Sequence, residues 1–341
     1  MEIDIILEPD LSTQQIRELA VAAERYGIRA LWMSNYFAHW DPFVALVPVV
    51  MATKRLRVGA LALSPFEMHP LKIANAVLSL NELSGGRAEV SIGAGEGNLD
   101  AMALGKPQKI VGAIREAVEI VIGAGTGRLK AAGYKGEHFQ VTYPCAYEWL
   151  KSPPPRVYLG AYRHQMMRAG ARVADAVFIG CTPLEILDPA IAAIREGLGR
   201  RETQRADFKI NSFWAWHLKK DRKEGYRESR RELAWRARKL DADLINLFLS
   251  PEDVQTVRDH WQDFVNAWFD RSGNIKGVPD RITNALCEGF TSTGGLEDLD
   301  REIERFRQFG VKGQTTISLR LHDDPMEALD IIGKHVVPRL K

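Results

Sequence analysis

The chain has 341 residues, 26% of them charged and 45% hydrophobic, with a formal net charge of +2 at pH 7. This length exceeds that of small modules held together by disulfides or metals, and it allows one large barrel or two ordinary domains. The charges form no basic arm, which gives no support to nucleic-acid binding, and no apolar stretch reaches the roughly 18 residues of a membrane span. We therefore expect a soluble globular protein that binds neither nucleic acid nor membrane.

The N-terminus and the cysteines indicate a cytoplasmic location. The first ten residues, MEIDIILEPD, carry acids where a signal peptide needs a basic start and a long apolar stretch. Cys145, Cys181 and Cys287 are far apart and odd in number, so they predict neither a disulfide framework nor a CxxC site. A reducing cytoplasm fits this cysteine usage best.

The first half of the chain alternates short apolar runs with longer amphipathic segments. The run Ile3–Leu7 is followed by apolar residues at helical spacing from Ile16 to Ala23, and then by Gly27 as a helix stop. The same unit recurs, which indicates βαβ units and a parallel sheet. The expected strands are Ile3–Leu7, Ala30–Met33, Leu56–Leu63 and Ala88–Ile92, and the further helices are Phe43–Met51, Pro70–Leu83 and roughly Lys109–Ile122.

The second half resumes this alternation after a Gly-rich aromatic stretch, Gly133–Val141, and a run of prolines, Pro153–Pro155. Residues 221–285 are heavily charged and helical in pattern, so we expect them to form an insertion after the seventh strand. The chain closes with an amphipathic helix that stops at Gly310, a strand and a last helix. The expected strands of this half are Val157–Leu159, Ala176–Ile179, Lys209–Leu218 and Thr315–Leu321.

Eight strands that alternate with helices predict a (β/α)8 TIM barrel, because a doubly wound sheet usually has five or six strands. We expect residues 1–341 to form one domain that contains the helical insertion 221–285. No ninth strand is expected. The active sites of such barrels lie at the C-terminal ends of the strands, so functional side chains are sought there.

The segment Gly93–Asn98 at the end of the fourth strand is rich in glycine. Glycines allow backbone N–H groups to approach a phosphate or a flat ring. The spacing resembles the dinucleotide fingerprint GxGxxG only loosely, so a nicotinamide-binding Rossmann site and a plain tight turn remain alternatives. A plain turn does not need Glu96 between two glycines, and a carboxyl beside a ring is suited to donate a proton.

Polar and aromatic side chains gather at the ends of the first two strands. Asn35, Tyr36, His39 and Trp40 follow the second strand, and Glu8 ends the first. A solvated carboxylate at the barrel rim is the alternative interpretation of Glu8, and an ordinary surface or core histidine is that of His39. We nevertheless keep all five residues as candidates for the site.

The seventh strand carries Trp214, Trp216 and His217. Alternation places the two tryptophans on one face and the histidine on the other, and core packing accounts for them. No cluster of His, Asp or Glu has the spacing of metal ligands, and no Ser/His/Asp arrangement is recognisable in the sequence. We therefore expect no metal site.

Several motifs together resemble the bacterial luciferase-like superfamily. The likeness covers nearly the whole chain, falls within the deazaflavin-dependent (coenzyme F420) branch, and is greatest to the methylenetetrahydromethanopterin reductases. The residues that carry it are Leu56–Gly59, Ser64-Pro65, His69-Pro70, Leu83–Arg87, Ile92–Gly95, Tyr134–Val141, Val157–Ala161 and Ala174–Ala176.

The resemblance implies a barrel that holds a flavin or deazaflavin at the C-terminal ends of the strands, under the insertion. It implies a bulge in strand three with a non-proline cis peptide at Leu61-Ala62, behind the ring. Asn35 and Tyr36 stand where deazaflavin enzymes commonly carry Asp-His, and an asparagine still offers the ring hydrogen bonds. The remaining implied cofactor contacts are Gly93, Ala94, Gly95, Gly97 and Asn98 in the glycine-rich turn, and Gly160, Ala161 and Gln165 for phosphate and tail.

The resemblance also implies catalytic positions. Glu96 and Trp40 fall on the acid and the tryptophan of a related deazaflavin-dependent sugar-phosphate dehydrogenase. Together with Glu8 and His39 they form the candidate catalytic set, in which Glu96 or Glu8 handles the proton.

The expected function is that of a coenzyme F420-dependent oxidoreductase that transfers a hydride between the deazaflavin ring and a small organic substrate. A methylene-tetrahydropterin-type C1 carrier is the candidate substrate. The alternatives are an FMN-dependent monooxygenase of the same fold and a flavin-binding protein without turnover. By resemblance, we expect a homo-oligomer, either a dimer or a tetramer.

Overall fold

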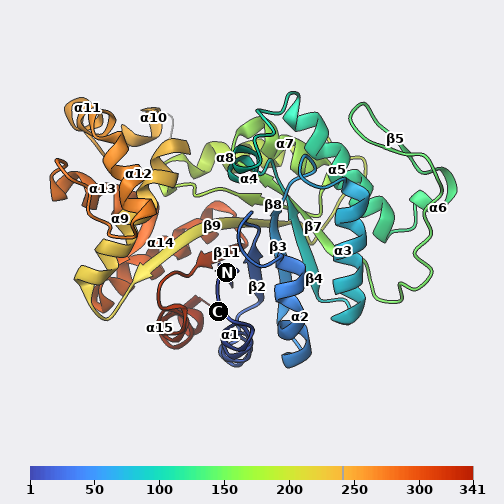
Figure 1. Ribbon diagram of the computed structural model, residues 1–341, viewed down its shortest axis with the longest axis horizontal. Coiled ribbons are helices and arrows are strands. Elements are labelled where there is room, and N and C mark those ends of the chain that lie inside the picture. The colour runs from blue at the N-terminus through green and yellow to red at the C-terminus, as the bar shows by residue number, and fades with distance from the viewer. Residues whose placement is uncertain (240–241, 341) are drawn as a thin grey trace.

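Eight parallel strands close into a barrel in the computed structural model, which describes residues 1–239 and 242–340 without the side chains of 96, 236–239, 242 and 243 (Figure 1). Each barrel strand pairs with its neighbours in parallel, and the last strand returns to the first. The predicted (β/α)8 barrel is confirmed. Its strands, in order around the barrel, are β1 (Glu2–Leu7), β2 (Ala30–Ser34), β3 (Arg57–Leu63), β4 (Ala88–Ile92), β7 (Arg156–Ala161), β8 (Ala176–Ile179), β9 (Lys209–Leu218) and β11 (Thr316–Arg320).

The outer helices begin and end where local sequence signals place them. Ser12 and Gln15 form a capping box at the start of the first helix, and Gly27 ends it with φ of 78°. Proline opens three of the helices at N1. The helices around the barrel are α1 (Thr13–Tyr26), α2 (Pro42–Ala52), α3 (Pro70–Leu83), α5 (Ile110–Gly125), α7 (His164–Val173), α8 (Leu187–Gly199), α14 (Leu299–Lys312) and α15 (Pro325–Ile331).

Shorter elements lie in the connections. A hairpin of β5 (Tyr134–Lys135) and β6 (Gln140–Val141) occupies the stretch Tyr134–Val141. The remaining short helices are α4 (Glu96–Ala101), α6 (Leu129–Ala132) and α16 (Val337–Leu340), with single turns at 184–186, 296–298 and 332–336.

The described part of residues 221–285 contains helices and no strand. In Figure 1 these helices lie beside the barrel, at the left of the view. The last of them continues to Phe290, five residues beyond the predicted boundary. Their bounds are α9 (Arg222–Lys239), α10 (Ala242–Ile245), α11 (Pro251–Asp259), α12 (Trp261–Phe269) and α13 (Asp280–Phe290).

A ninth strand, β10 (Thr291–Gly294), corrects the expectation that there is none. It pairs in parallel with the end of β9, from Ala215 to Leu218, outside the closed ring of eight. Its sequence, Thr-Ser-Thr-Gly, is polar although all four residues are buried. The hydroxyls of Thr291 and Thr293 bond each other and Ser229, so the strand is stable without the apolar side chains that pattern analysis detects.

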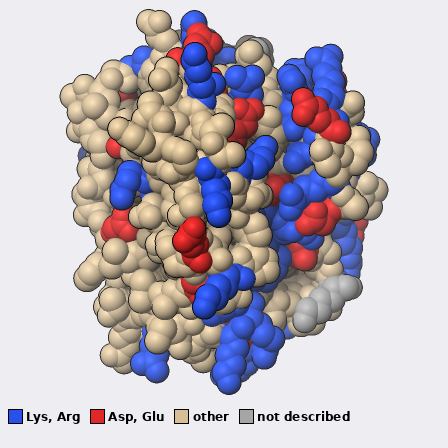
Figure 2. Space-filling model, turned by 90° about the vertical axis from the view of Figure 1, so that its right-hand side faces the viewer, with Lys and Arg blue, Asp and Glu red and all other residues tan. Residues whose placement is uncertain are grey.

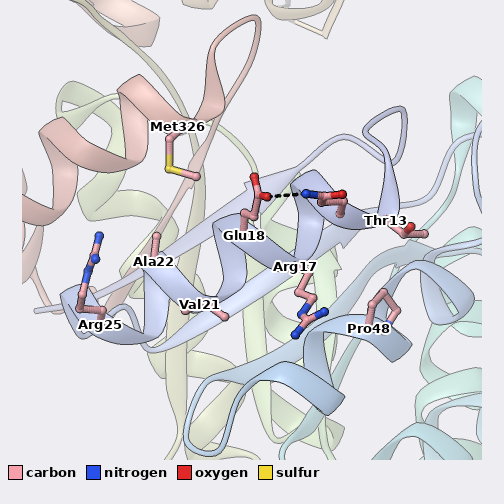
Figure 3. A pocket seen from close by; sticks show the side chains of 9 residues that line it. Thr13, Arg17, Glu18, Val21, Ala22, Arg25, Pro48 and Met326 are labelled. Atoms are coloured by element: carbon pink, nitrogen blue, oxygen red, sulfur yellow. Dashed lines mark hydrogen bonds between the residues drawn. The ribbon is translucent and has the colours of Figure 1, made fainter.

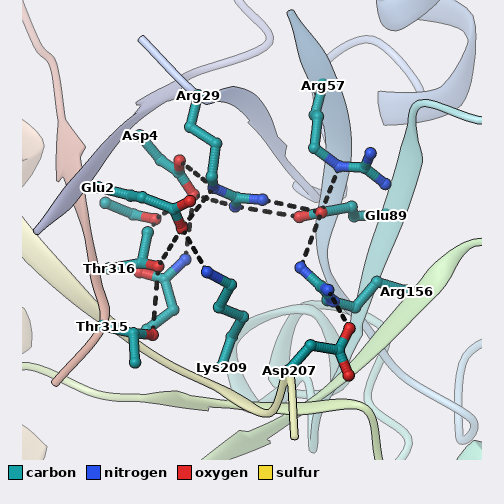
Figure 4. A network of polar contacts seen from close by, with 12 residues as sticks. Glu2, Asp4, Arg29, Arg57, Glu89, Arg156, Asp207, Lys209, Thr315 and Thr316 are labelled. Carbon is teal, nitrogen blue, oxygen red and sulfur yellow. Dashed lines mark hydrogen bonds and ion pairs between the residues drawn. The ribbon is translucent and has the colours of Figure 1, made fainter. Parts of the chain in front are cut away.

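The bottom of the barrel is filled by a buried network of charges centred on Arg29 (Figure 4). Arg29 donates to Asp4 with Nε at 2.8 Å and to Glu89 with Nη1 at 2.8 Å, and both carboxylates are fully buried. Arg57 donates to Glu89 from a third strand at 2.6 Å. The network joins β1, the start of β2, β3 and β4, and therefore ties the N-terminal ends of these strands together.

An aromatic layer lies above the charges. The ring of Trp32 meets Tyr158 and Phe178 edge-on, with centroids 5.1 and 5.3 Å away, and its Nε1 donates to Asp4 at 2.8 Å. Glycine is required at position 59 because a Cβ atom there would lie 2.2 Å from the Trp32 ring. With the lower barrel filled in this way, the open end is the one formed by the C-terminal ends of the strands.

The surface shows mixed charge on the face drawn in Figure 2, where Asp and Glu lie among the Lys and Arg side chains. The two ends of the chain meet at the barrel, where the N-terminal amino group of Met1 donates to the carbonyl of Leu340 at 2.9 Å. No helix among the described residues is long and apolar enough to cross a membrane.

Removing the Glu89 charge is predicted to destabilise the barrel. Burial alone would raise the pKa of Glu89, but the charges of Arg29 and Arg57 lower it to about 2, from 4.5 for the free group. Because the pKa of the Glu89 carboxyl is lower in the folded than in the unfolded chain, its charge stabilises the fold fully above about pH 4.5. This stabilisation is lost as the pH falls toward 2. We expect Glu89→Gln to cost about 3–5 kcal/mol in urea unfolding at pH 7, since it leaves buried arginines undercompensated.

The difference between Glu89→Gln and the unsubstituted protein should shrink when unfolding is measured at pH 3. Glu304→Gln is the matched control, because Glu304 forms an exposed pair with Arg307, and it should change stability by less than about 0.5 kcal/mol. A difference that is the same at both pH values would contradict the role assigned to the Glu89 charge.

Candidate active site

Strand β3 is irregular at the C-terminal mouth of the barrel. The peptide bond between Leu61 and Ala62 is cis, which confirms the prediction made from the resemblance. The pairing of β3 with β4 shifts register between Ala60 and Leu63. The backbone N–H of Asn35 donates to the carbonyl of Leu61 at 2.6 Å, so the end of β2 is attached to this irregular segment.

Beside this segment, three neighbouring strands present backbone without large side chains. Ala62 of β3, Gly93 after β4 and Gly160 of β7 lie side by side, because a Cβ atom on Gly93 would be 3.2 Å from the Ala62 Cβ and one on Gly160 would be 3.5 Å from the Gly93 Cα. We call these three residues the small-residue floor. A flat ring could approach the backbone here, because no large side chain at these positions would keep it away.

Glu67 joins the loops after β2, β3 and β4. Its Oε2 accepts hydrogen bonds from Nδ2 of Asn35 at 3.1 Å and from Nδ2 of Asn98 at 2.9 Å. Its Oε1 is buried without a hydrogen-bond partner in the described structure, against Gly95. Sequence reasoning missed Glu67, although it lies between two motif segments at the end of a strand.

Arg320 at the end of β11 organises the opposite side of the mouth. It donates to Tyr36 at 2.6 Å and to Glu8, and its Nη1 lies 3.4 Å from Glu232 of α9. Burial raises the pKa of Glu8. The positive charge of Arg320 opposes this rise, and the negative charge of Glu232 adds to it. Burial also raises the pKa of Tyr36, which keeps the phenol protonated. Because Tyr36 accepts from Arg320, its own proton remains available to a ligand.

Sequence reasoning missed both Arg320 and Glu232. The detectable signal for Arg320 was a single basic residue near the end of the otherwise uncharged segment Thr315–Leu321. Glu232 lies within the charged insertion, where one buried carboxylate cannot be told from its solvated neighbours.

The rings of His217 and His322 stack on each other, with centroids 4.9 Å apart. His217 Nδ1 lies 2.7 Å from Glu228 of α9, and Lys219 donates to the same carboxylate at 2.9 Å. Burial alone would raise the pKa of Glu228, but the bond with His217 and nearby positive charge lower it to about 2. Burial and the Arg320 charge lower the pKa of His322, so its ring is neutral. The insertion thus contributes carboxylates to the mouth.

The remaining predicted residues of the β2 loop lie near the rim. His39 is exposed and meets the Tyr36 ring edge-on, with centroids 5.6 Å apart. Trp40 is half exposed, and its N–H donates to the carbonyl of Pro9 at 3.1 Å, which joins this loop to the end of β1. The structure therefore brings Glu8, Tyr36, His39 and Trp40 to one side of the mouth.

The predicted residues of the glycine-rich turn lie on the other side. The carbonyl of Ala94 accepts a hydrogen bond from Ser64 Oγ at 2.8 Å. Gly97 faces Trp235 of α9, since a Cβ atom added to Gly97 would lie 3.7 Å from the tryptophan ring. Gly95 has φ of 73° and precedes α4, whose first residue is Glu96. The Glu96 side chain lies outside the described structure.

The predicted tail contacts lie at the end of β7 and at the start of α7. Ala161 is buried, and its carbonyl accepts from Gly180 N–H at 3.1 Å. Gln165 is exposed in the first turn of α7, farther along the chain from the floor. Trp214 and Trp216 are buried against Phe309 and Phe306 as core residues, so the packing interpretation is correct.

The residues of the mouth fit a flat heterocyclic cofactor. The small-residue floor leaves space that Cβ atoms would fill, and polar side chains from the loops surround it. The described residues contain no group of three or more His, Cys, Asp or Glu that could hold a metal ion. The arrangement suits ring binding and proton handling.

The chain belongs to the luciferase-like monooxygenase family, whose model matches residues 4–313. It is 26% identical over 346 residues to the 5,10-methylenetetrahydromethanopterin reductase of Archaeoglobus fulgidus, and the match covers 100% of both chains.

Solved structures show the same fold. The coenzyme F420-dependent tetrahydromethanopterin reductase from Methanopyrus kandleri superposes with a TM-score of 0.83 at 18% identity, covering 100% of both chains. An F420-dependent secondary alcohol dehydrogenase, solved with an F420-acetone adduct, superposes with a TM-score of 0.74 at 15% identity, again covering 100% of both chains.

Proposed function

We propose that this protein is a coenzyme F420-dependent oxidoreductase that transfers a hydride between the deazaflavin ring and a small organic substrate. The observation that carries the proposal is the small-residue floor of Ala62, Gly93 and Gly160 beside the Leu61-Ala62 segment, because it offers a flat ring an uncovered backbone. The full-length likeness to a 5,10-methylenetetrahydromethanopterin reductase supports a deazaflavin rather than another ring.

The residues of the mouth divide into those that hold the cofactor and those that act on the substrate. The ring would lie on the small-residue floor, with Asn35 and Tyr36 at its edge. When bound, the deazaflavin supplies or accepts the hydride. The other proposed cofactor contacts are Leu61, Ala94, Gly95, Gly97 and Asn98 for the ring, and Ala161 and Gln165, with Gly160, for the phosphate and tail.

The proton that accompanies hydride transfer is assigned to Glu96 or Glu8. Glu96 opens α4 directly after the glycine-rich turn, three residues beyond Gly93 of the floor, and this position supports the assignment. Glu8 is held by Arg320, and its raised pKa favours the protonated form that a donor requires. His39 and Trp40 belong to the loop beside Glu8 and would line the substrate side of the mouth.

The substrate class proposed from the relatives is a methylene-tetrahydropterin-type C1 carrier. An FMN-dependent monooxygenase is the second candidate function, because Asn35-Tyr36 replaces the Asp-His pair common in deazaflavin enzymes and the family model is that of monooxygenases. A flavin-binding protein without turnover is the third. It is the least supported, because storage of a cofactor does not require the Glu8–Arg320–Tyr36 arrangement.

We also propose that the protein works in the cytoplasm as a homo-oligomer. None of Cys145, Cys181 and Cys287 forms a disulfide in the described structure, as a reducing compartment allows. Helix α2 exposes Val44, Val47 and Met51 at one-face spacing, with exposed fractions of 57%, 40% and 72%. Next to this face a groove runs between α1, Pro48 of α2 and Met326 of α15 (Figure 3). A dimer that covers this face would remove the apolar side chains from water.

Isothermal titration tests the cofactor. We expect coenzyme F420 to bind more tightly than FMN. Gly160→Val should weaken both by at least about tenfold because its side chain rises from the floor, whereas Gly310→Val, where a Cβ meets nothing within 4 Å, should leave affinity unchanged. Tighter binding of FMN, with oxygen consumed on substrate addition, would establish the monooxygenase instead.

Substitution of Glu96 tests the proton donor. Glu96→Gln should leave cofactor affinity within a few-fold but lower the rate of hydride transfer by about two orders of magnitude, since general acid catalysis is worth roughly 10²–10⁴-fold. The measurement is pre-steady-state hydride transfer at saturating cofactor. An unchanged rate would move the role to Glu8, and an unchanged rate in Glu8→Gln as well would leave His39 or water.

The oligomer is tested by light scattering after gel filtration. We expect a dimer or tetramer for the unsubstituted protein and a lower mass for the double variant Val47→Glu, Met51→Lys, which places charge in the apolar face. Val311→Glu on α14 is the control, because Val311 is 87% exposed on a different helix and should not affect assembly. A monomeric unsubstituted protein would contradict the proposal.

A further inference from the structure

The side chain of Glu67 hydrogen-bonds both asparagines of the proposed ring site. The turn after β3 places it there, with the backbone N–H of Glu67 donating to the carbonyl of Ser64 at 3.2 Å. Oε2 then accepts from Nδ2 of Asn35 at 3.1 Å and from Nδ2 of Asn98 at 2.9 Å. A single carboxylate therefore ties together the loops that follow three adjacent strands.

The carboxylate determines which way the two amides point. An ionised carboxylate only accepts hydrogen bonds, so each asparagine must turn its NH2 group toward Glu67 and its Oδ1 away. The other contacts of these NH2 groups agree, since Nδ2 of Asn35 lies 3.4 Å from the carbonyl of Ala62 and Nδ2 of Asn98 lies 3.5 Å from the carbonyl of Asn35. These four hydrogen bonds end on three oxygens, and none of the three can donate.

The two Oδ1 atoms are left as acceptors. No hydrogen bond joins either of them to another group in the described structure, although Asn98 is only 6% exposed. Neither Oδ1 atom is among the fully buried atoms that lack a partner, so each can be reached by a hydrogen-bond donor of a ligand. Asn35 adjoins the small-residue floor through Ala62, so the donor would belong to a ring lying on that floor.

Glu67 is itself held in place by close packing. Its Oε1 lies against Gly95, where a Cβ atom would be 2.3 Å away. Gly95 also has a positive φ of 73°. Any side chain at position 95 would therefore displace the carboxylate as well as strain the turn.

We propose that Glu67 is a positioning residue that orients the amides of Asn35 and Asn98, so that their Oδ1 atoms share the single imide N–H of the bound ring in a bifurcated hydrogen bond. The inference rests on the proposed binding of a flavin-type ring. Deazaflavins and flavins both carry this N–H between two carbonyl groups, so the role of Glu67 is independent of which of the two cofactors binds.

Two substitutions separate anchoring from charge. Glu67→Gln keeps an acceptor oxygen that both asparagines can reach, whereas Glu67→Met has similar volume and no such acceptor. We expect the Kd for coenzyme F420, measured by its fluorescence, to rise less than about threefold in Glu67→Gln and at least tenfold in Glu67→Met. Equal losses in the two variants would overturn the proposal, because charge alone would then account for them.

The matching probe is coenzyme F420 methylated at the imide nitrogen, which cannot donate this hydrogen bond. The unsubstituted protein should bind the methylated cofactor at least tenfold more weakly than F420. In Glu67→Met the difference between the two cofactors should be much smaller, because the substitution and the methylation remove the same hydrogen bond. Discrimination that is undiminished in Glu67→Met would overturn the proposal. If that variant does not fold, Asn98→Ala replaces it, with the same expected pattern.

Glu24→Met is the matched control for loss of an anchoring carboxylate. Oε1 of Glu24 accepts from the backbone N–H groups of Lys54, Arg55 and Leu56, away from the mouth of the barrel. It should lower the Tm while leaving the Kd unchanged. If Glu67→Met also lowers the Tm and leaves the Kd unchanged, the positioning role of Glu67 is wrong but the proposed function stands. If the unsubstituted protein binds neither F420 nor FMN, both the proposed function and the role of Glu67 are wrong.

Discussion

The buried guanidinium of Arg29 is the contact on which the rest of the structure depends. It lies between two carboxylates, Asp4 and Glu89, that are themselves fully buried on different strands. Each of these charges would be costly without its partners, so the strand ends must stay together for the network to be satisfied. The registers of β1, β2, β3 and β4 are therefore coupled at the bottom of the barrel.

This filled base determines where a ligand can enter. Trp32 rests on the network through its bond to Asp4 and occupies the space that the missing side chain of Gly59 leaves. Above this layer lie the small residues Ala62, Gly93 and Gly160. The barrel thus has large side chains at its base and small ones at its C-terminal mouth, where the proposed site lies.

The mouth is completed by parts of the chain that are far apart in sequence. Arg320 bonds Tyr36, which lies 284 residues earlier, and reaches Glu232 of the insertion 88 residues before it. Glu228 of the same helix holds His217. Helix α9 thus borders the mouth, and the charge of its Glu232 adds to the burial that raises the pKa of Glu8.

The sequence by itself determined the alternation of strands and helices, the barrel and the helices of residues 221–285, because hydrophobic period and the positions of glycine and proline are local signals. The cis bond at Leu61-Ala62 was expected from the family resemblance of the short motifs. The sequence did not reveal β10, since that strand is polar and is stabilised by hydroxyl contacts. Only the tertiary structure decided the partners of the site, including Glu67, Arg320 and Glu232. Their importance comes from burial and from contacts across strand ends, and the chain's own order does not encode which polar residue meets which.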